Sequence, residues 1–132
     1  MAVKKPRQPR YADIFRADEE KAVKAREVWR ETIEWLDENG LLTVRRVEIA
    51  DRYARACAEY HALYPIALEE GPVKVGPNGG DVFNFNWSAC EKLNDRMAKF
   101  EDALLISPKS AQDKVAEKPP ASKPTKADAY LD

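Results

Sequence analysis

Apolar residues recur at steps of three and four between Ala17 and Leu36, which is the period of an α-helix. The repeating positions are Ala22, Ala25, Trp29, Ile33 and Leu36. With Trp35 beside them, the apolar arc is wider than one neighbouring helix would cover. We therefore expect a first long helix that buries against more than one partner and ends at Asn39-Gly40.

A second helix is predicted over about residues 44–70, with Thr43 as its N-cap. Its apolar seam alternates steps of three and four, as in a heptad repeat. The seam consists of Val47, Ala50, Ala54, Cys57, His61, Tyr64 and Leu68. Pro65 falls inside this pattern, and we expect a kink there because the next three residues keep a helical character. The short link at Leu41-Leu42 predicts an antiparallel helical hairpin.

The pattern changes to a strand-like one after Gly71. Two short β-prone runs, 73–75 and 82–83, are separated by Asn78-Gly79, which is the dipeptide most typical of a tight hairpin turn. A β-hairpin is therefore predicted at about residues 72–84.

A third helix is predicted from about Trp87 to Leu105, with Asn84 or Asn86 as its cap. Ser107-Pro108 is typical of the start of a further short helix. The fold class that follows is mainly α: an antiparallel helical hairpin, a small β-hairpin and a third long helix.

The composition is that of one globular unit with a charged surface. The chain has 132 residues, of which 44% are hydrophobic and 34% charged. We expect a basic flexible arm at 1–16, a helical oligomerisation core at 17–116 and a disordered C-terminal tail at 117–132. No apolar run is long enough to cross a membrane, and no apolar stretch follows the basic N-terminus as in a secretory signal. A cytoplasmic protein without a membrane partner is expected.

Residues typical of catalysis or metal binding are few. His61 follows Cys57 by four residues, and Cys90 is the only other thiol, so these three are the one candidate zinc set. The chain has no Cys-x-x-Cys pair, and we interpret all three as core residues. The glycine-rich run 76–80 lacks the Lys-Ser/Thr of a phosphate-binding loop. We expect no enzyme activity, no cofactor and no metal site.

Basic residues are segregated toward the N-terminus although the net charge of the chain is only −1. The first ten residues hold cations and no acid, and such an arm can track phosphate groups without forming a fixed site. A purely solubilising role is the alternative. The candidate DNA-binding residues are Lys4, Lys5, Arg7, Arg10, Arg16, Lys21, Lys24, Arg45 and Arg46.

The wide apolar faces of the first two helices predict contacts between copies of the chain. Trp29 and Trp35 are interpreted as core or interface residues and not as platforms for stacking bases. The candidate oligomer-interface residues are Trp29, Ile33, Trp35, Leu36, Val47, Ala50, Ala54 and Tyr64.

Short motifs follow one another in a definite order between about residues 20 and 115. They are Ala25 to Trp29, Glu38 to Thr43, Asp51-x-Tyr53, Glu69 to Gly71, Pro77 to Gly80, Asn84-x-Asn86 and Leu104 to Ala111. In this order they resemble the small terminase subunits of tailed bacteriophages, in the branch that lacks an obvious winged DNA-binding domain. Leu105 stands where that family usually has glycine, and Ala111-Gln112 replaces its usual arginine.

The resemblance implies a non-catalytic subunit that assembles into a homo-oligomeric ring, with a nonamer as the expected size. It implies binding of double-stranded phage DNA at the packaging site, and recruitment and regulation of the large terminase subunit, an ATPase and nuclease, in the infected host cell. It also makes the tail, 117–132, the expected docking element for the large subunit. Two alternatives remain: a small helical DNA-binding transcription regulator whose recognition helix starts at Arg45-Arg46, and an interaction scaffold that binds no nucleic acid.

Overall fold

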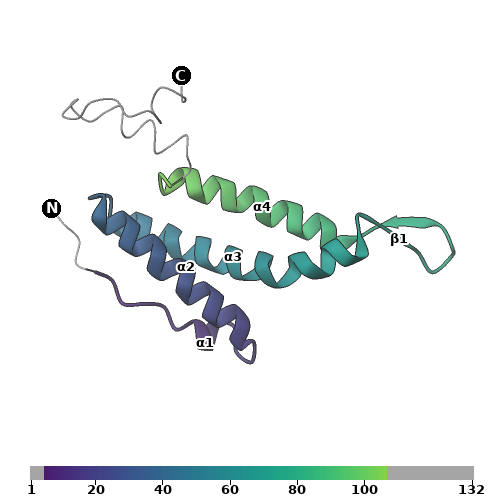
Figure 1. Cartoon of the computed structure of the whole chain (residues 1–132), viewed down its shortest axis with the longest axis horizontal. Coiled ribbons are helices and arrows are strands. Elements are labelled where there is room, and N and C mark those ends of the chain that lie inside the picture. Colours follow the sequence, from purple (N-terminus) through teal and green to yellow (C-terminus); the bar gives the residue numbers. More distant parts are fainter. Residues whose placement is uncertain (1–4, 107–132) are drawn as a thin grey trace, which may run out of the picture.

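Four helices and one β-hairpin make up the computed structural model, which describes residues 5–106. The elements are α1 (Tyr11–Ile14), α2 (Glu19–Glu38), α3 (Val44–Glu70), β1 (Val73–Val75), β2 (Asp81–Phe83) and α4 (Phe85–Ala103). α3 lies in the middle, with α1 and α2 packed on one side and α4 on the other (Figure 1). The predicted mainly α fold with a small β-hairpin is confirmed. None of the helices between residues 5 and 106 is long and apolar enough to cross a membrane.

Local signals fix the ends of the helical hairpin. Asp18 caps α2 by accepting a hydrogen bond from the backbone N of Lys21 at 3.1 Å. Thr43 caps α3 in the same way, with the backbone N of Arg46 as donor at 3.1 Å. Between them Gly40 adopts a φ of 66°, a conformation that glycine takes without strain. The predicted start of the second helix and the predicted stop of the first are both confirmed.

The hydrophobic core fills the space between α2 and the first half of α3. Each large side chain buried there contributes about 1.5–3 kcal/mol. Alanines on α3 keep the two helices close together. The cluster contains Tyr11, Ala22, Ala25, Trp29, Ile33, Leu36, Leu41, Leu42, Ala50, Ala54, Ala58 and Leu104.

The second half of α3 does not follow the sequence prediction. His61, Tyr64 and Leu68, which were expected on the buried seam, are exposed. α3 has 27 residues and α2 has 20, and Lys21, close to the start of α2, already pairs with Glu59 at 3.0 Å. Because α2 has no further residues to cover the rest of α3, the interpretation of His61 as a core residue was wrong. α3 does continue through Pro65 to Glu70, as expected.

The N-terminal segment also differs from the expectation. Tyr11 is 1% exposed, and its hydroxyl donates a hydrogen bond to Oδ1 of Asp51 on α3 at 2.9 Å. Phe15 lies beside it, with ring centroids 6.3 Å apart. The prediction of an arm without core contacts therefore fails from Tyr11 onward, because an aromatic side chain in this segment completes the core of the helices.

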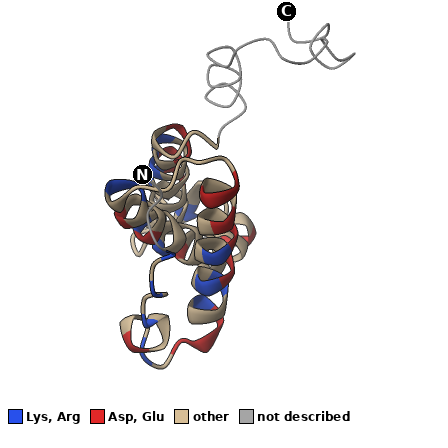
Figure 2. Ribbon diagram, turned by 90° about the vertical axis from the view of Figure 1, so that its left-hand side faces the viewer, with Lys and Arg blue, Asp and Glu red and all other residues tan. Residues whose placement is uncertain are grey.

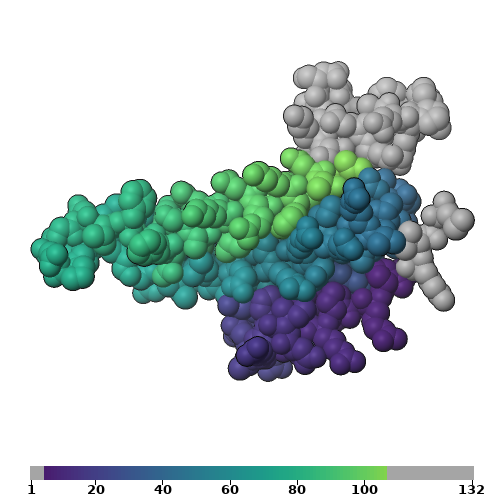
Figure 3. Space-filling model, turned by 180° about the vertical axis from the view of Figure 1, so that it is seen from behind, coloured from purple at the N-terminus to yellow at the C-terminus, as the bar shows by residue number. Residues whose placement is uncertain are grey.

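α4 packs along the other side of α3. The hydroxyl of Tyr53 donates a hydrogen bond to Oε2 of Glu101 at 2.7 Å, which ties the two helices together. Asn84 is the N-cap of α4, and the predicted cap is thereby confirmed. The β-hairpin precedes α4 and projects beyond the helices at one end of the molecule (Figures 1 and 3). The predicted helix at Ser107-Pro108 and the tail at 117–132 lie outside the described residues.

Candidate nucleic-acid interface

The segment that leads into α1 carries exposed basic side chains. Lys5, Arg7 and Arg10 are all exposed, as is Arg16 just after α1. Figure 2 shows basic residues spaced along this part of the chain. The side chains of these four residues make no hydrogen bond or ion pair with another residue of the described range 5–106. Their charges are therefore available to an external anion. Lys4 lies outside the described residues.

Tyr11 determines where this basic segment lies. Burial raises the pKa of the Tyr11 hydroxyl, and the neighbouring Asp51 carboxylate raises it further. The hydroxyl therefore stays protonated and keeps donating to Asp51. Asp51 also accepts two hydrogen bonds from Arg55, at 3.1 and 2.9 Å, so the carboxylate is held from both sides. The basic segment is thus anchored on α3 at one point.

Two of the predicted DNA-binding residues have partners within the protein. Lys21 pairs with Glu59 at 3.0 Å and with Asp18 at 3.8 Å, and the hydrogen bond to Glu59 raises its pKa. Nη1 of Arg46 donates to the backbone O of Leu41 at 2.9 Å and so stabilises the turn between α2 and α3. The structure does not present these two side chains as free cations.

Lys24 and Arg45 differ in their surroundings. Lys24 lines a surface hollow together with Glu19, Glu20 and Glu27, so acidic groups surround it. Arg45 is exposed in the first turn of α3. It lies at the end of the molecule where α2 meets α3, and Figure 1 places the start of the basic segment at the same end. Arg45 is the predicted residue outside the segment that is best placed to add to it.

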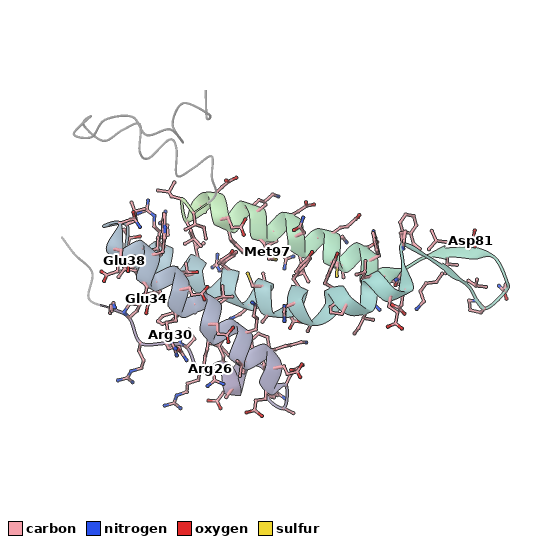
Figure 4. The ribbon with its side chains drawn as sticks, in the orientation of Figure 1. Arg26, Arg30, Glu34, Glu38, Asp81 and Met97 are labelled. Atoms are coloured by element: carbon pink, nitrogen blue, oxygen red, sulfur yellow. The ribbon has the colours of Figure 1, made fainter. Side chains whose placement is uncertain are left out.

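The outer stripe of α2 holds two arginines that the sequence reasoning did not select. Arg26, Arg30, Glu34 and Glu38 follow one another at steps of four along one side of the helix (Figure 4). Such neighbours share a helix face, so the stripe is basic toward the start of α2 and acidic toward its end. The spacing of Arg26 and Arg30 in the sequence was the signal for this basic half.

The candidate interface residues fall into two groups. Trp29, Ile33, Leu36, Ala50 and Ala54 are buried within the chain's own core. Trp35 and Val47 are partly buried against that core, and Tyr64 is exposed and stacked on Tyr60, with ring centroids 5.3 Å apart. The structure thus leaves three of the eight candidates, Trp35, Val47 and Tyr64, with surface that another copy can touch.

The two cysteines and the histidine do not form a metal site. Cys57 and Cys90 are buried free cysteines, and burial raises the pKa of Cys57 to about 11. His61 is exposed. Within residues 5–106, no three His, Cys, Asp or Glu side chains are grouped so that they could hold a metal ion.

A polar cluster at the base of the β-hairpin was missed by the sequence reasoning. Glu70, at the end of α3, accepts hydrogen bonds from Lys74 at 2.7 Å and from the Asn86 side chain at 2.8 Å. Asn84 is 1% exposed and donates to the backbone O of Gly71 at 2.7 Å. We call Glu70, Lys74, Asn84 and Asn86 the hairpin clamp. The Asn84-x-Asn86 spacing was visible in the sequence, but it was interpreted only as a helix cap and as one motif of the family resemblance.

The family model described as phage terminase, small subunit, matches residues 25–121. This stretch is well over half of the chain and includes α3, the β-hairpin, α4 and most of α2. The chain belongs to the phage terminase small subunit family. Its role therefore lies in the packaging of phage DNA, and small terminase subunits are generally regulatory and DNA-binding subunits rather than catalytic ones. Neither the curated proteins nor the solved structures include a match to this small terminase subunit.

Proposed function

We propose that this small terminase subunit binds double-stranded phage DNA at the packaging site and recruits and regulates the large terminase subunit, which starts genome packaging. The observation that carries the proposal is the family match over residues 25–121. Because the match begins within α2, the basic segment lies outside the matched stretch, and its role needs an argument of its own.

The basic segment suits electrostatic binding to the DNA backbone. Its exposed cations, Lys5, Arg7 and Arg10, have no acidic partner among the described residues, so binding phosphates costs them no existing ion pair. Neutralising phosphates releases counterions, and this term acts on any duplex sequence. The segment therefore supplies affinity, and Arg45 and Arg30 extend the same charge onto the helices.

The proposed assembly is a homo-oligomeric ring, a nonamer, in the cytoplasm of the infected host cell. Trp35, Val47 and Tyr64 are the candidate contact residues that remain accessible in the single chain. The tail at 117–132 is the proposed docking element for the large terminase subunit.

A salt titration of DNA binding tests the role of the basic segment. The variant replaces Lys4, Lys5, Arg7 and Arg10 with alanine, and affinity for duplex DNA is measured at several salt concentrations. If the four cations neutralise four phosphates, the slope of log K against log salt falls by about 3–4, because each contributes roughly 0.9.

The matched control replaces four other exposed cations, Arg52, Lys92, Arg96 and Lys99, with alanine. It changes the net charge equally but leaves the basic segment intact, so the salt slope should stay near that of the unmodified protein. An unchanged slope in the first variant, or equal losses in both, would show that the segment has no specific role in DNA binding.

A further inference from the structure

A surface groove lies between α1, α3 and α4. α1 and the residue after it line one side, α4 lines the other, and α3 lies between them. The volume of the groove is about 450 Å³, which is within the range typical of ligand sites in proteins. We call it the α1–α3–α4 groove.

Both sides of the groove carry apolar side chains that are not fully covered. Phe15 on one side and Leu93 and Phe100 on the other are half-buried. Ile14, beside Phe15, is 38% exposed. Phe15 also packs against the core, so this side of the groove is held in place. An apolar side chain that entered the groove would remove apolar surface from water on both sides.

Two arginines of the groove carry charges that the chain does not pair. Arg52 on α3 and Arg96 on α4 are exposed, and their side chains make no hydrogen bond or ion pair with another residue between 5 and 106. Arg55 also lines the groove but is bonded to a carboxylate of α3. The one acid of the lining, Glu59, is held by Lys21. The groove is therefore suited to a ligand that is both apolar and acidic.

The chain itself contains a segment with this chemistry. Residues 127–132, outside the described range, read Ala-Asp-Ala-Tyr-Leu-Asp. Tyr130 and Leu131 are the only two adjacent large apolar residues beyond residue 106. Asp128 and Asp132 flank them, and the segment has no cation. We call residues 127–132 the tail end.

We propose that the tail end binds in the α1–α3–α4 groove of its own subunit. Its aromatic and aliphatic side chains cover the apolar sides of the groove, and its two carboxylates pair with Arg52 and Arg96. Apolar contact and charge thus act together, and neither the rest of the tail nor the groove alone combines the two features needed.

The connection along the chain favours this occupant over a free acidic segment of another protein. Phe100, which lines the groove, is only six residues before Ile106, the last described residue. The 20 residues 107–126 then span up to about 66 Å, more than the roughly 28 Å length of α4. Tethering supplies a local concentration on the order of 1 mM. A contact with a Kd of about 0.1 mM is then filled in roughly nine of ten chains.

DNA is a poorer match for the groove than the tail end. A phosphate backbone can pair with the two arginines, but it gains nothing by covering the apolar sides. The salt titration described above includes a variant without Arg52 and Arg96, and its slope is expected to stay unchanged. A reduced slope in that variant would assign the two arginines to DNA and overturn the inference.

One consequence rests on the proposed function. If the tail is the docking element for the large terminase subunit, the large subunit competes with the groove for the tail end. The docking element is then covered until the large subunit arrives. The contact itself requires neither DNA nor the large subunit, so it is tested on this chain alone.

Competition with a fluorescent peptide of residues 124–132 tests whether the tail end occupies the groove. Fluorescence anisotropy measures the Kd of the peptide for the full chain and for a full chain with Tyr130→Ser and Leu131→Ser. The groove is filled in the first and open in the second, so the peptide should bind the second about tenfold more tightly. Adding Arg52→Glu and Arg96→Glu to the second chain should then weaken binding tenfold or more.

Exchanging the charges shows whether the contact is direct. A peptide with Asp128→Lys and Asp132→Lys should bind the chain with the two reversed arginines and fail to bind the chain with the original ones. This restored binding also shows that the reversed chain is folded. The matched control carries Lys92→Glu and Lys99→Glu, exposed cations of α4 outside the groove, and should leave the Kd unchanged.

Three results would overturn the inference: no peptide binding to the chain with the open groove, equal Kd values for the open and unmodified chains, or equal losses in the arginine variant and its control. Co-assembly of subunits that lack the tail-end side chains with subunits that lack the two arginines gives a fourth test. Peptide binding should persist in these mixed assemblies. Its loss would show that tail ends reach the groove of a neighbouring copy, and the contact within one subunit would be refuted. Loss of DNA binding or of large-subunit binding would leave all these results unchanged, so failure of the proposed function is seen separately.

Discussion

Replacing Tyr11 tests whether the basic segment is held against the helices. Tyr11→Phe removes only the hydroxyl, which donates to Asp51 at 2.9 Å. A hydrogen bond to a charged group contributes about 1.5–3 kcal/mol. Asp51 keeps its two bonds from Arg55 and is not left without a partner, so the loss should be at the low end, about 1.5 kcal/mol.

Tyr11→Ala removes the ring as well. The side chain is almost completely buried against the core, and deleting a buried aromatic ring costs about 3–5 kcal/mol. Urea unfolding followed by helical circular dichroism measures both variants. For a domain of this size the loss of about 1.5 kcal/mol expected for Tyr11→Phe should also lower the Tm by roughly 6–9 °C. Ile14→Ala is the control, because Ile14 lies on the same short helix but is exposed, and it should change stability by about 0.5 kcal/mol or less.

A stability of Tyr11→Ala within about 0.5 kcal/mol of the unmodified chain would refute the reasoning, because that is the size of a typical surface effect. It would mean that the segment is not docked on α3 in solution. The salt slope of DNA binding gives an independent check. Tyr11→Ala keeps every cation of the segment, so the slope should persist even where stability falls.

Three further predictions concern α3, the hairpin and their junction. Asn84→Ala should lower the free energy of unfolding by about 2 kcal/mol, because it removes the side chain that caps α4 and that donates to the backbone O of Gly71; urea unfolding measures this. Burial raises the pKa of Cys57 from 9.0 to about 11, so the thiol should resist alkylation at pH 8. For the same reason the contribution of the protonated thiol to stability is complete below pH 9 and should be lost as the pH rises through 11. The hydrogen bond from Lys74 lowers the pKa of Glu70 most, and the bond from Asn86 lowers it further. The contribution of the Glu70 carboxylate to stability is therefore present above the ordinary pKa of 4.5 and is lost as the pH falls through the lowered pKa. Glu70→Gln should abolish this acid-dependent loosening of the hairpin, followed by the NMR signals of β1 and β2.

Local signals in the sequence predicted much of the fold. Thr43 at the start of α3 and Gly40 after α2 each act over a few residues, and the structure uses both as expected. The hairpin forms where Asn78-Gly79 predicted it, although the strands are joined through residues 76–80 and of the two only Gly79 has a positive φ. The helical periods likewise gave the buried side of α2 and of the first half of α3. These features could be predicted because their physical cause lies within a few residues of the site.

The features that were missed depend on residues far apart in the chain. The burial of Tyr11 requires Asp51, forty residues later, and nothing near Tyr11 indicates that partner. The period of α3 shows which side of the helix is apolar but not how far α2 extends along it, so the exposure of Tyr64 and Leu68 could not be read from it. For the candidate site, the sequence identified the basic residues but not the acidic ones near them, which are Glu59 paired with Lys21 and the glutamates around Lys24.

Pro65 gives the central helix an uneven stiffness along its length. With 27 residues α3 is about 40 Å long, and it connects the end that carries Arg45 to the end that carries the hairpin. A proline in a helix lacks the backbone donor for the carbonyl four residues earlier, here that of His61. This gap lies just beyond the part of α3 that α2 covers, where α4 is the helix that still packs beside α3. The half of α3 that lies between α2 and α4 is therefore expected to be stiffer than the half that carries Pro65 and leads to the hairpin.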